Sequence, residues 1–448
     1  MIRAAIVLAL TALLAALPAG AQTLFAPDSA GHLVPVDSLT SSYVVSGVRV
    51  IQRQSHASDI VAVDLILLGG TQQLTPATQG IERLALDAAS YGTRRYPGAT
   101  AHRAVRHTGS VIYTISEADW TVFGFEGLAD QFDSTFAAIA DRVVAPTLDS
   151  AAVAVARATL RVEARRRLEQ PDAWVRHLAD SVAFAGHPYA LDPDGTPESL
   201  DQITTADVRR YAAEQFVTSR MLLVVVGPVS RAQVERAVSA TLGTLPHGAY
   251  VWAPPPPIPT HKGAALAVVA HQASTNYLLG FFGGPPVTSS DYPAFAVATE
   301  LLGGELSTDV REKRALSYAA YAPYLARAVA VGGLYASTLW PDQVLPVMRE
   351  EIQQMETSDM PNWWVGDYEN QFITGFYYGN ETNGDQAGQL ARAAILDGDY
   401  RQAGHSLDRI RKVSSYDVHR MVHRYMHNIQ MVYFGDPARL GKVKLDGF

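Results

Sequence analysis

The chain has 448 residues, of which 48% are hydrophobic and 18% are charged, and this composition excludes disorder as a description of the whole chain. It contains no cysteine, which excludes disulfide bonds, thiolate metal sites and a cysteine nucleophile. The 36 basic residues stand against 44 acidic ones, for a net charge of −8, so we expect no nucleic-acid partner held by charge.

Residues 1–21 have the pattern of a secretory signal peptide. Arg3 supplies the positive charge, residues 4–17 form an uncharged apolar run, and Ala19 and Ala21 are the small residues ahead of a cleavage site. The run is shorter than the roughly 20 apolar residues that a membrane span needs, and no later segment has transmembrane length. The sequence therefore predicts an exported protein without a membrane span, periplasmic in a bacterium and otherwise secreted.

Strands and helices alternate in pairs through the first half of the chain. Their apolar periods predict strands at 44–52, 60–68, 110–115 and 121–127, and helices at 78–90, 131–145 and 149–168. Paired strands followed by paired helices are typical of antiparallel sheets in an α+β fold, and argue against a parallel doubly wound sheet.

A proline run marks the middle of the chain. Residues 254–257 are all proline, and such a run is a stiff extended spacer that fits neither a helix nor a central strand. We therefore predict a linker at 251–262 between an N-terminal domain, 22–250, and a C-terminal domain, 263–448.

The two halves end alike. Residues 199–203 read Ser-Leu-Asp-Gln-Ile and residues 406–410 read Ser-Leu-Asp-Arg-Ile, and each motif precedes a Ser- or Thr-capped helix, a hydrophobic strand and a Gly/Pro stop signal. The matching order indicates an internal duplication. We expect two similar α+β domains, each an antiparallel sheet with helices packed on one face.

One helix carries a candidate site. Within the helix predicted at 78–90, Arg83 and Asp87 lie one turn apart and share a face. Glu163 follows on another predicted helix. The residues alone support only a helix pair with a few solvated charges.

Several motifs, taken together and in order, resemble the pitrilysin/insulinase family of zinc peptidases, and among them the two-domain subunits of the mitochondrial-processing-peptidase type. The resemblance covers nearly all of the chain after residue 21. It includes Leu-Gly-Gly-Thr at 68–71, the helix ending in Gly-Thr at 92–93, Asp-Arg-Val-Val-Ala-Pro at 141–146, His-Pro-Tyr at 187–189, Gly-Thr-Pro-Glu-Ser-Leu at 195–200, Leu-Leu-Gly-Gly at 301–304 and Val-Arg-Glu-Lys-Arg at 310–314.

The resemblance implies a degenerate zinc site. The family's zinc helix carries H-x-x-E-H, whose histidines bind the metal and whose glutamate activates water; Arg83, Leu86 and Asp87 occupy these positions, and Glu163 matches the third ligand. Leucine cannot transfer a proton, and arginine does not bind zinc at neutral pH. We therefore expect no metal on this chain, and a salt-bridged site in which Arg83 pairs with Asp87 and Glu163.

A second pair of residues matches the family's substrate-binding arginine and tyrosine. Arg311 and Tyr318 are seven residues apart, as in the family, where this pair binds the substrate's backbone carbonyl. From the residues alone, the segment is a charged loop ahead of a strand. The alternative is that the pair is inherited from the family and has no present use.

In the family that the chain resembles, lack of the zinc motif together with the Arg/Tyr pair is a feature of one subunit of heterodimeric metallopeptidases, and the resemblance therefore implies such a subunit. The resemblance implies a homologous partner that carries H-x-x-E-H and the zinc, and unfolded peptides as substrates. The alternative is a catalytically inactive peptide-binding or scaffold protein of the same fold. A lone zinc peptidase needs ligands that the chain does not show. His419, His423 and His427 share one helix face without an adjacent glutamate, so we expect them to form a solvated face.

Overall fold

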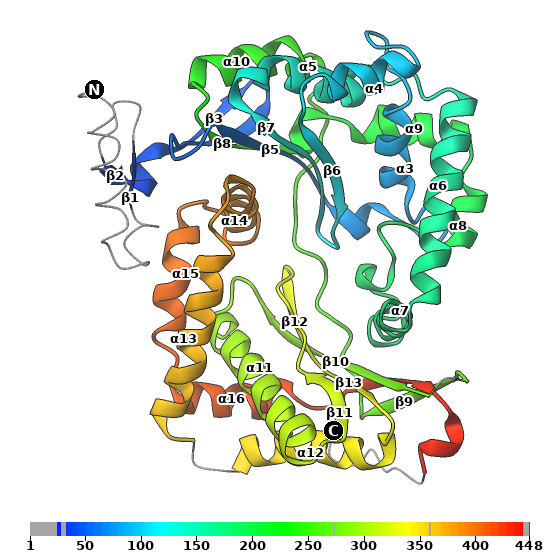
Figure 1. Cartoon of the computed structure of the whole chain (residues 1–448), viewed down its shortest axis with the longest axis vertical. Coiled ribbons are helices and arrows are strands. Elements are labelled where there is room, and N and C mark those ends of the chain that lie inside the picture. Colours follow the sequence, from blue (N-terminus) through cyan, green and yellow to red (C-terminus); the bar gives the residue numbers. More distant parts are fainter. Residues whose placement is uncertain (1–24, 28–32, 273, 358–359, 442–447) are drawn as a thin grey trace.

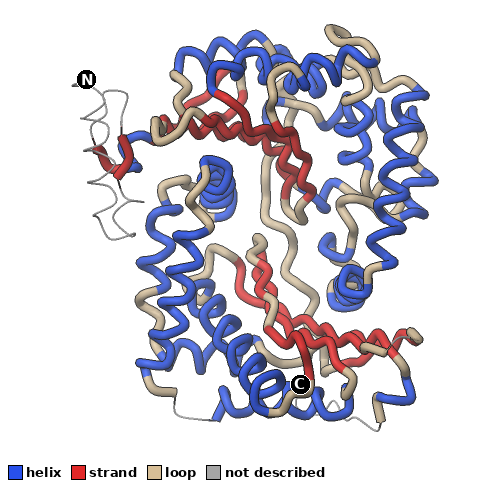
Figure 2. The backbone as a smooth tube through the Cα atoms, viewed as in Figure 1, coloured by secondary structure: helices blue, strands red, loops and turns tan. Residues whose placement is uncertain are grey.

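The computed structural model describes residues 25–27, 33–272, 274–357, 360–441 and 448, so the predicted signal peptide lies outside the described part. The chain forms two halves, which lie at the top and bottom of Figure 1. Residues 251–262, the predicted linker, contain no helix or strand and run from one half to the other (tan tube, Figure 2).

A six-stranded sheet forms the centre of the first half. Its spatial order is β3 (Thr40–Val45), β4 (Val48–Gln54), β8 (Met221–Gly227), β5 (Ile60–Leu68), β7 (Trp120–Leu128) and β6 (Val111–Ser116). The single strand predicted at 44–52 is wrong, because Ser46 and Gly47 both have positive φ, 49° and 86°, and turn the chain back into the β3–β4 hairpin.

The second half repeats this arrangement. Its sheet has the order β9, β14, β10, β13 and β11, with β12 paired to β13. The strands are β9 (Ala265–Ala270), β10 (Asn276–Pro286), β11 (Ser317–Tyr321), β12 (Tyr324–Leu325), β13 (Val329–Thr338) and β14 (Gln430–Gly435). A separate short pair joins β1 (Phe25–Pro27) to β2 (Leu33–Pro35).

The predicted α+β class with two similar domains is confirmed, and one detail of the sheets differs. Each sheet contains one parallel pair, β4 with β8 and β14 with β9, among otherwise antiparallel neighbours. The partners in each parallel pair are far apart in sequence, so no hairpin dictates their direction. The same pairing at the same place in both sheets agrees with the duplication.

Helices surround both sheets. Those of the first half are α3 (Ile81–Ala89), α4 (Ala99–Arg106), α5 (Phe132–Val144), α6 (Ser150–Glu169), α7 (Pro171–Ala183), α8 (Pro197–Gln202), α9 (Thr205–Gln215) and α10 (Arg231–Ala240). Those of the second half are α11 (Tyr292–Leu306), the π-helix η7 (Ser307–Lys313), α12 (Pro341–Thr357), α13 (Asn362–Tyr378), α14 (Asn383–Leu396), α15 (Gln402–Ile410) and α16 (Ser415–Tyr425). Short 3-10 turns are η1 (Val36–Leu39), η2 (Gly70–Gln73), η3 (Ala129–Gln131), η4 (Pro188–Ala190), η5 (Thr218–Arg220), η6 (Leu242–Thr244) and η8 (Pro437–Arg439). In the described part of the chain, no helix has both the length and the apolar character to span a membrane.

The halves interlock through two exchanged helices. Helix α14 of the second half packs on β5 and β8 of the first sheet, and α7 of the first half packs on β10 and β14 of the second (Figure 1). Each sheet therefore has helices of its own half on one face, as predicted, and a helix of the other half on its second face. All seven residues of β8 are buried, so both faces of that strand need a cover, and the other half supplies the second one.

A buried carboxylate joins the halves at this interface. Asp119, between β6 and β7, is 2% exposed. It accepts a hydrogen bond of 2.8 Å from the Tyr189 hydroxyl and one of 2.9 Å from the backbone N–H of Ala328 in the second half. Burial raises the pKa of Asp119, and these hydrogen bonds oppose the rise. The polar contact fixes how the two apolar faces meet.

The interlocked helices predict that the halves unfold together. Leu390 of α14 is buried against the first sheet, so Leu390→Ala should lower the free energy of unfolding by about 2–5 kcal/mol. Chemical denaturation of this variant, followed by far-ultraviolet circular dichroism, should show one transition at lower denaturant. The volume-conserving Leu390→Met should cost less than about 1.5 kcal/mol. Two transitions, with only one shifted, would contradict this coupling.

Candidate functional site

Helix α3 is buried except for one narrow stripe of its surface. Its other side chains are buried, and only Arg83 and Asp87 are half-buried. The two are one turn apart, and Arg83 Nε donates to Asp87 Oδ2 over 2.9 Å. The positions that match the family's two histidines are therefore occupied by an ion pair.

Two further carboxylates meet the same guanidinium. Arg83 NH1 lies 3.1 Å from Asp194 Oδ1, and Arg83 NH2 lies 3.9 Å from Glu163 Oε2 on α6. We call Asp87, Glu163 and Asp194 the acidic cluster. Arg167, also on α6, lies 3.6 Å from the other oxygen of Asp194. The structure thus brings Asp87 and Glu163 together around the guanidinium of Arg83.

Close backbone packing brings Asp194 to this place. Gly80, which precedes α3, has φ of 84°, and a Cβ there would lie 2.8 Å from the carbonyl oxygen of Asp194. Gly195 also has positive φ, and a Cβ there would lie 2.9 Å from the carbonyl oxygen of Gln79. Only glycine fits such contacts. Sequence reasoning missed Asp194; the signal for it was the Asp-Pro-Asp-Gly turn at 192–195.

Burial and charge act in opposite directions on the pair. Burial raises the pKa of Asp87, the Arg83 guanidinium lowers it, and the first effect is larger. For Arg83, burial lowers the pKa, but the attraction of Asp87, Asp194 and Glu163 outweighs burial and holds the pKa above its ordinary value. Arg83 is therefore a permanent cation that satisfies the acidic cluster.

The residues at these positions do not fit a zinc ion. Arginine and leucine replace a ligand and the general base, and the two carboxylates that remain are held by Arg83. Within the described ranges, no group of three or more His, Cys, Asp or Glu side chains is placed to hold a metal, the stretch with His419 and His423 included. Leu86, 1% exposed, belongs to the apolar core.

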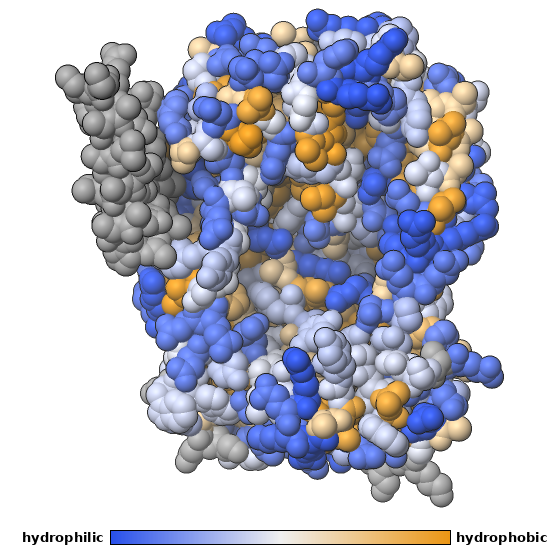
Figure 3. All heavy atoms as spheres, in the orientation of Figure 1, coloured by the Kyte–Doolittle hydropathy of each residue, from blue (hydrophilic) through white to orange (hydrophobic). Residues whose placement is uncertain are grey.

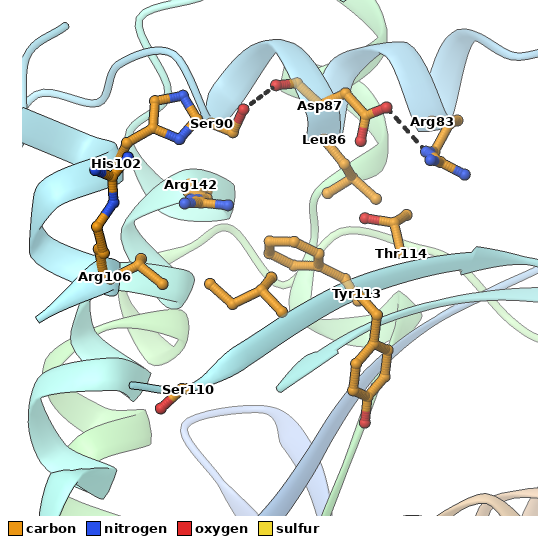
Figure 4. A pocket seen from close by; sticks show the side chains of 13 residues that line it. Arg83, Leu86, Asp87, Ser90, His102, Arg106, Ser110, Tyr113, Thr114 and Arg142 are labelled. Atoms are coloured by element: carbon orange, nitrogen blue, oxygen red, sulfur yellow. Dashed lines mark hydrogen bonds and ion pairs between the residues drawn. The ribbon is translucent and has the colours of Figure 1, made fainter. Parts of the chain in front are cut away.

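A pocket opens beside this helix. It has a volume of about 390 Å³ and lies between α3, α4, α5 and the strands β6 and β7. Leu86 points into it from α3, and Arg142, His102 and Arg106 line it from the opposite side (Figure 4). Sequence reasoning did not single out Arg142, because its position in α5 has the apolar period of a core residue.

Arg311 and Tyr318 lie in the other half. Arg311 is on η7 and Tyr318 is the second residue of β11. Both are exposed, Tyr318 at 86%, and the Arg311 guanidinium carbon is 5.6 Å from the Tyr318 ring centroid. Lys313 and Arg314 both pair with Asp309, at 3.1 Å and 2.9 Å. Among the described residues Arg311 has no such acidic partner.

The structure does not bring the two predicted sites together. Helix α3 lies in one half and β11 in the other (Figure 1), and no hydrogen bond or ion pair between described residues joins Arg311 or Tyr318 to the acidic cluster.

Removal of the central cation should destabilise the fold in a pH-dependent way. Arg83→Met leaves Asp87 half-buried without its partner, and should lower the free energy of unfolding at pH 8 by about 2 kcal/mol. The pKa of Asp87 should rise further, so the folded state should bind a proton more readily than the unfolded chain. The loss should therefore shrink as pH falls through that raised pKa. Thermal denaturation of both proteins between pH 5 and 8 measures how this loss of stability varies with pH.

A matched control separates this effect from loss of any surface ion pair. On the solvent-facing side of α9, Arg210 NH2 lies 2.6 Å from Asp207 Oδ1. Arg210→Met should change the free energy of unfolding by less than about 1 kcal/mol. An equal effect of the two substitutions, or a loss at Arg83 that does not vary with pH, would refute the role of Arg83.

Comparisons with known proteins agree with this geometry. Residues 49–192 match the model of the family described as "Insulinase (Peptidase family M16)", and residues 202–372 match the "Peptidase M16 inactive domain". The chain is 20% identical over 61% of its length to mitochondrial-processing peptidase subunit beta of Blastocladiella emersonii, and 21% identical over 62% to an uncharacterized zinc protease, YmxG, of Bacillus subtilis. It spans 58% of the length of the first relative and 68% of the second.

Solved structures share the whole fold. A protease from Helicobacter pylori superposes with a TM-score of 0.81 at 16% identity, covering 88% of this chain and 99% of that one. A peptidase M16 inactive domain from Pseudomonas fluorescens gives 0.79 at 17% identity, with 89% and 98% covered. With both domain types matched in order along it, the chain belongs to the insulinase family, peptidase family M16.

Proposed function

We propose that this chain is the non-zinc subunit of an exported insulinase-family metallopeptidase. It pairs with a homologous subunit that carries H-x-x-E-H and the zinc ion, and the pair hydrolyses unfolded peptides. Arg311 and Tyr318 supply donors for the substrate's carbonyl in the partner's site. The degenerate zinc site of Arg83, Leu86, Asp87 and Glu163 takes no part in the chemistry.

The observation that carries the proposal is the ion pair at the zinc positions. Arg83 and Asp87 are joined at 2.9 Å where the family has two histidines, and the base position is a buried leucine. Such a site cannot activate water. A peptidase role for this chain therefore needs a metal from another subunit.

The exposed pair on the second half supports a role in that other site. A guanidinium and a phenol both donate hydrogen bonds to the negative oxygen that forms when water attacks a peptide carbonyl. Arg311 and Tyr318 are adjacent, exposed and held on neighbouring elements. The half that bears them packs on the first sheet through α14, and in the proposed heterodimer the pair faces a substrate held by the partner.

An open sheet edge supports peptide binding. Strand β6 is the last strand of the first sheet, and no described strand pairs with its outer side. An extended peptide can add to such an edge through main-chain hydrogen bonds. The surface is hollowed between the two halves (Figure 3), so a peptide has access from solvent.

Peptidase activity after mixing tests the proposal. A candidate zinc subunit, this chain and their mixture would each be incubated with an unstructured fluorogenic peptide. The mixture should be active and neither protein alone should be. Arg311→Ala/Tyr318→Phe in this chain should lower kcat in the mixture about a hundredfold, because developing charge on the carbonyl loses its donors, while the two subunits still copurify.

Arg236→Ala/Tyr416→Phe is the matched control, because both side chains are exposed on other elements of this chain. The control variant should leave kcat unchanged. Equal activity of the zinc subunit with and without this chain would overturn the proposal and favour a binding or scaffold protein. Full activity of the Arg311/Tyr318 variant would make that pair an inherited feature.

A further inference from the structure

The pocket beside α3 contains a buried arginine without a partner. Arg142 is 7% exposed, and within the described part of the chain its guanidinium forms no hydrogen bond or ion pair. Arg83 is satisfied by the acidic cluster, whereas Arg142 is not. A charge buried in this way costs stability unless something neutralises it.

The surroundings of Arg142 add positive charge. Arg106, exposed at the end of α4, also lines the pocket and has no acidic partner among the described residues. His102 lines it too; burial, with Arg142 and Arg106 nearby, lowers the pKa of His102 and so favours its neutral form. The pocket thus holds two cations beyond the Arg83–Asp87 pair.

The acid in the pocket does not neutralise these cations. Asp87 attracts Arg142, but its carboxylate is bound to Arg83 at 2.9 Å and lies beyond ion-pair distance of Arg142. Burial lowers the pKa of Arg142 to about 10. The guanidinium is still charged at neutral pH, and its donors face a cavity of about 390 Å³ (Figure 4).

The position of the pocket indicates how an anion would arrive. Ile112 and Thr114 of β6 form one wall, and β6 is the open edge of the sheet. Alternate residues of a strand point to the same face. A peptide that adds to β6 therefore directs every second side chain toward α3, α4 and α5, where the pocket lies.

We propose that this pocket binds the carboxylate of an acidic side chain carried on an extended peptide along β6. Arg142 donates to the carboxylate at the base of the pocket, and Arg106 attracts it at the mouth. This inference rests on the proposed function in one respect, that the chain binds peptides. It adds that the chain selects acidic ones.

Fluorescence anisotropy with this chain alone tests the inference. Two labelled 12-residue unstructured peptides would differ only at a central Glu or Gln. The Glu peptide should bind about tenfold more tightly, since a charged hydrogen-bonded pair is lost with Gln. The preference should vanish in Arg142→Met and fall about threefold in Arg106→Ala. Arg103→Ala, exposed on the same helix outside the pocket, should leave it unchanged.

Thermal denaturation with free glutarate supplies the second arm. Arg142→Met should have a Tm no lower than that of the unsubstituted chain, because it removes a buried unpaired charge, and glutarate should raise the Tm only where Arg142 is present. A lower Tm together with an intact preference for Glu would show that Arg142 is structural and overturn the inference.

The outcomes separate this inference from the proposed function. Equal binding of the Glu and Gln peptides would overturn the acidic pocket and leave peptide binding in place. Binding of glutarate but of neither peptide would overturn the peptide as the source of the carboxylate, and with it the peptide-binding basis of the proposed function. A preference for Glu that persists in both Arg142→Met and Arg106→Ala would place the acidic site elsewhere and overturn the assignment.

Discussion

Carboxylates gathered in a partly buried site need a cation, and here an arginine meets that need. Asp87, Glu163 and Asp194 converge from α3, α6 and the loop before α8 on the guanidinium of Arg83. In a zinc peptidase a metal ion provides the positive charge, and the same charge also activates water. Arg83 neutralises the cluster without any coordination chemistry. A cluster neutralised in this way cannot activate water, so the proposed role depends on donors elsewhere in the chain.

The exchanged helices limit where those donors can act. Helices α7 and α14 each cover an apolar face of the opposite sheet, and Asp119 ties the halves together by buried hydrogen bonds. A hinge motion that brought Arg311 and Tyr318 onto α3 would expose these faces to water, at roughly 25 cal/mol for each Å². A second subunit that presents its own zinc helix to Arg311 and Tyr318 requires no such exposure. The cost of separating the exchanged helices from the sheets is thus an argument for the proposed heterodimer.

Local sequence patterns and the resemblance to one family were enough to predict some of the elements and site residues. The period of β5 at 60–68 and the helix that carries Arg83 and Asp87 are visible in the residues, and the resemblance to the family implied that Glu163 lies near them. The order of strands in the sheets, the exchange of α7 and α14, and the part played by Asp194 depend on contacts between distant segments. The hairpin at Ser46 and Gly47 was missed because the valines on both sides read as one strand. Arg142 was missed because its position follows the apolar period of α5, and that period does not distinguish a core residue from one that lines a pocket.

Arg83 on α3 and Arg142 on α5 carry the same charge, but that charge has different consequences at the two positions. Arg83 and Arg142 both lie largely out of solvent in the same region of the first half. The charge of Arg83 is used within the chain, since three carboxylates surround it. The charge of Arg142 is used by no described residue, and a leucine or methionine would fill the same space at lower cost to stability. A pocket whose wall is the open strand β6 and whose base is an unneutralised cation is stabilised when an anion enters. On the proposed function, this half would thus select the peptide by charge while the partner subunit cleaves it.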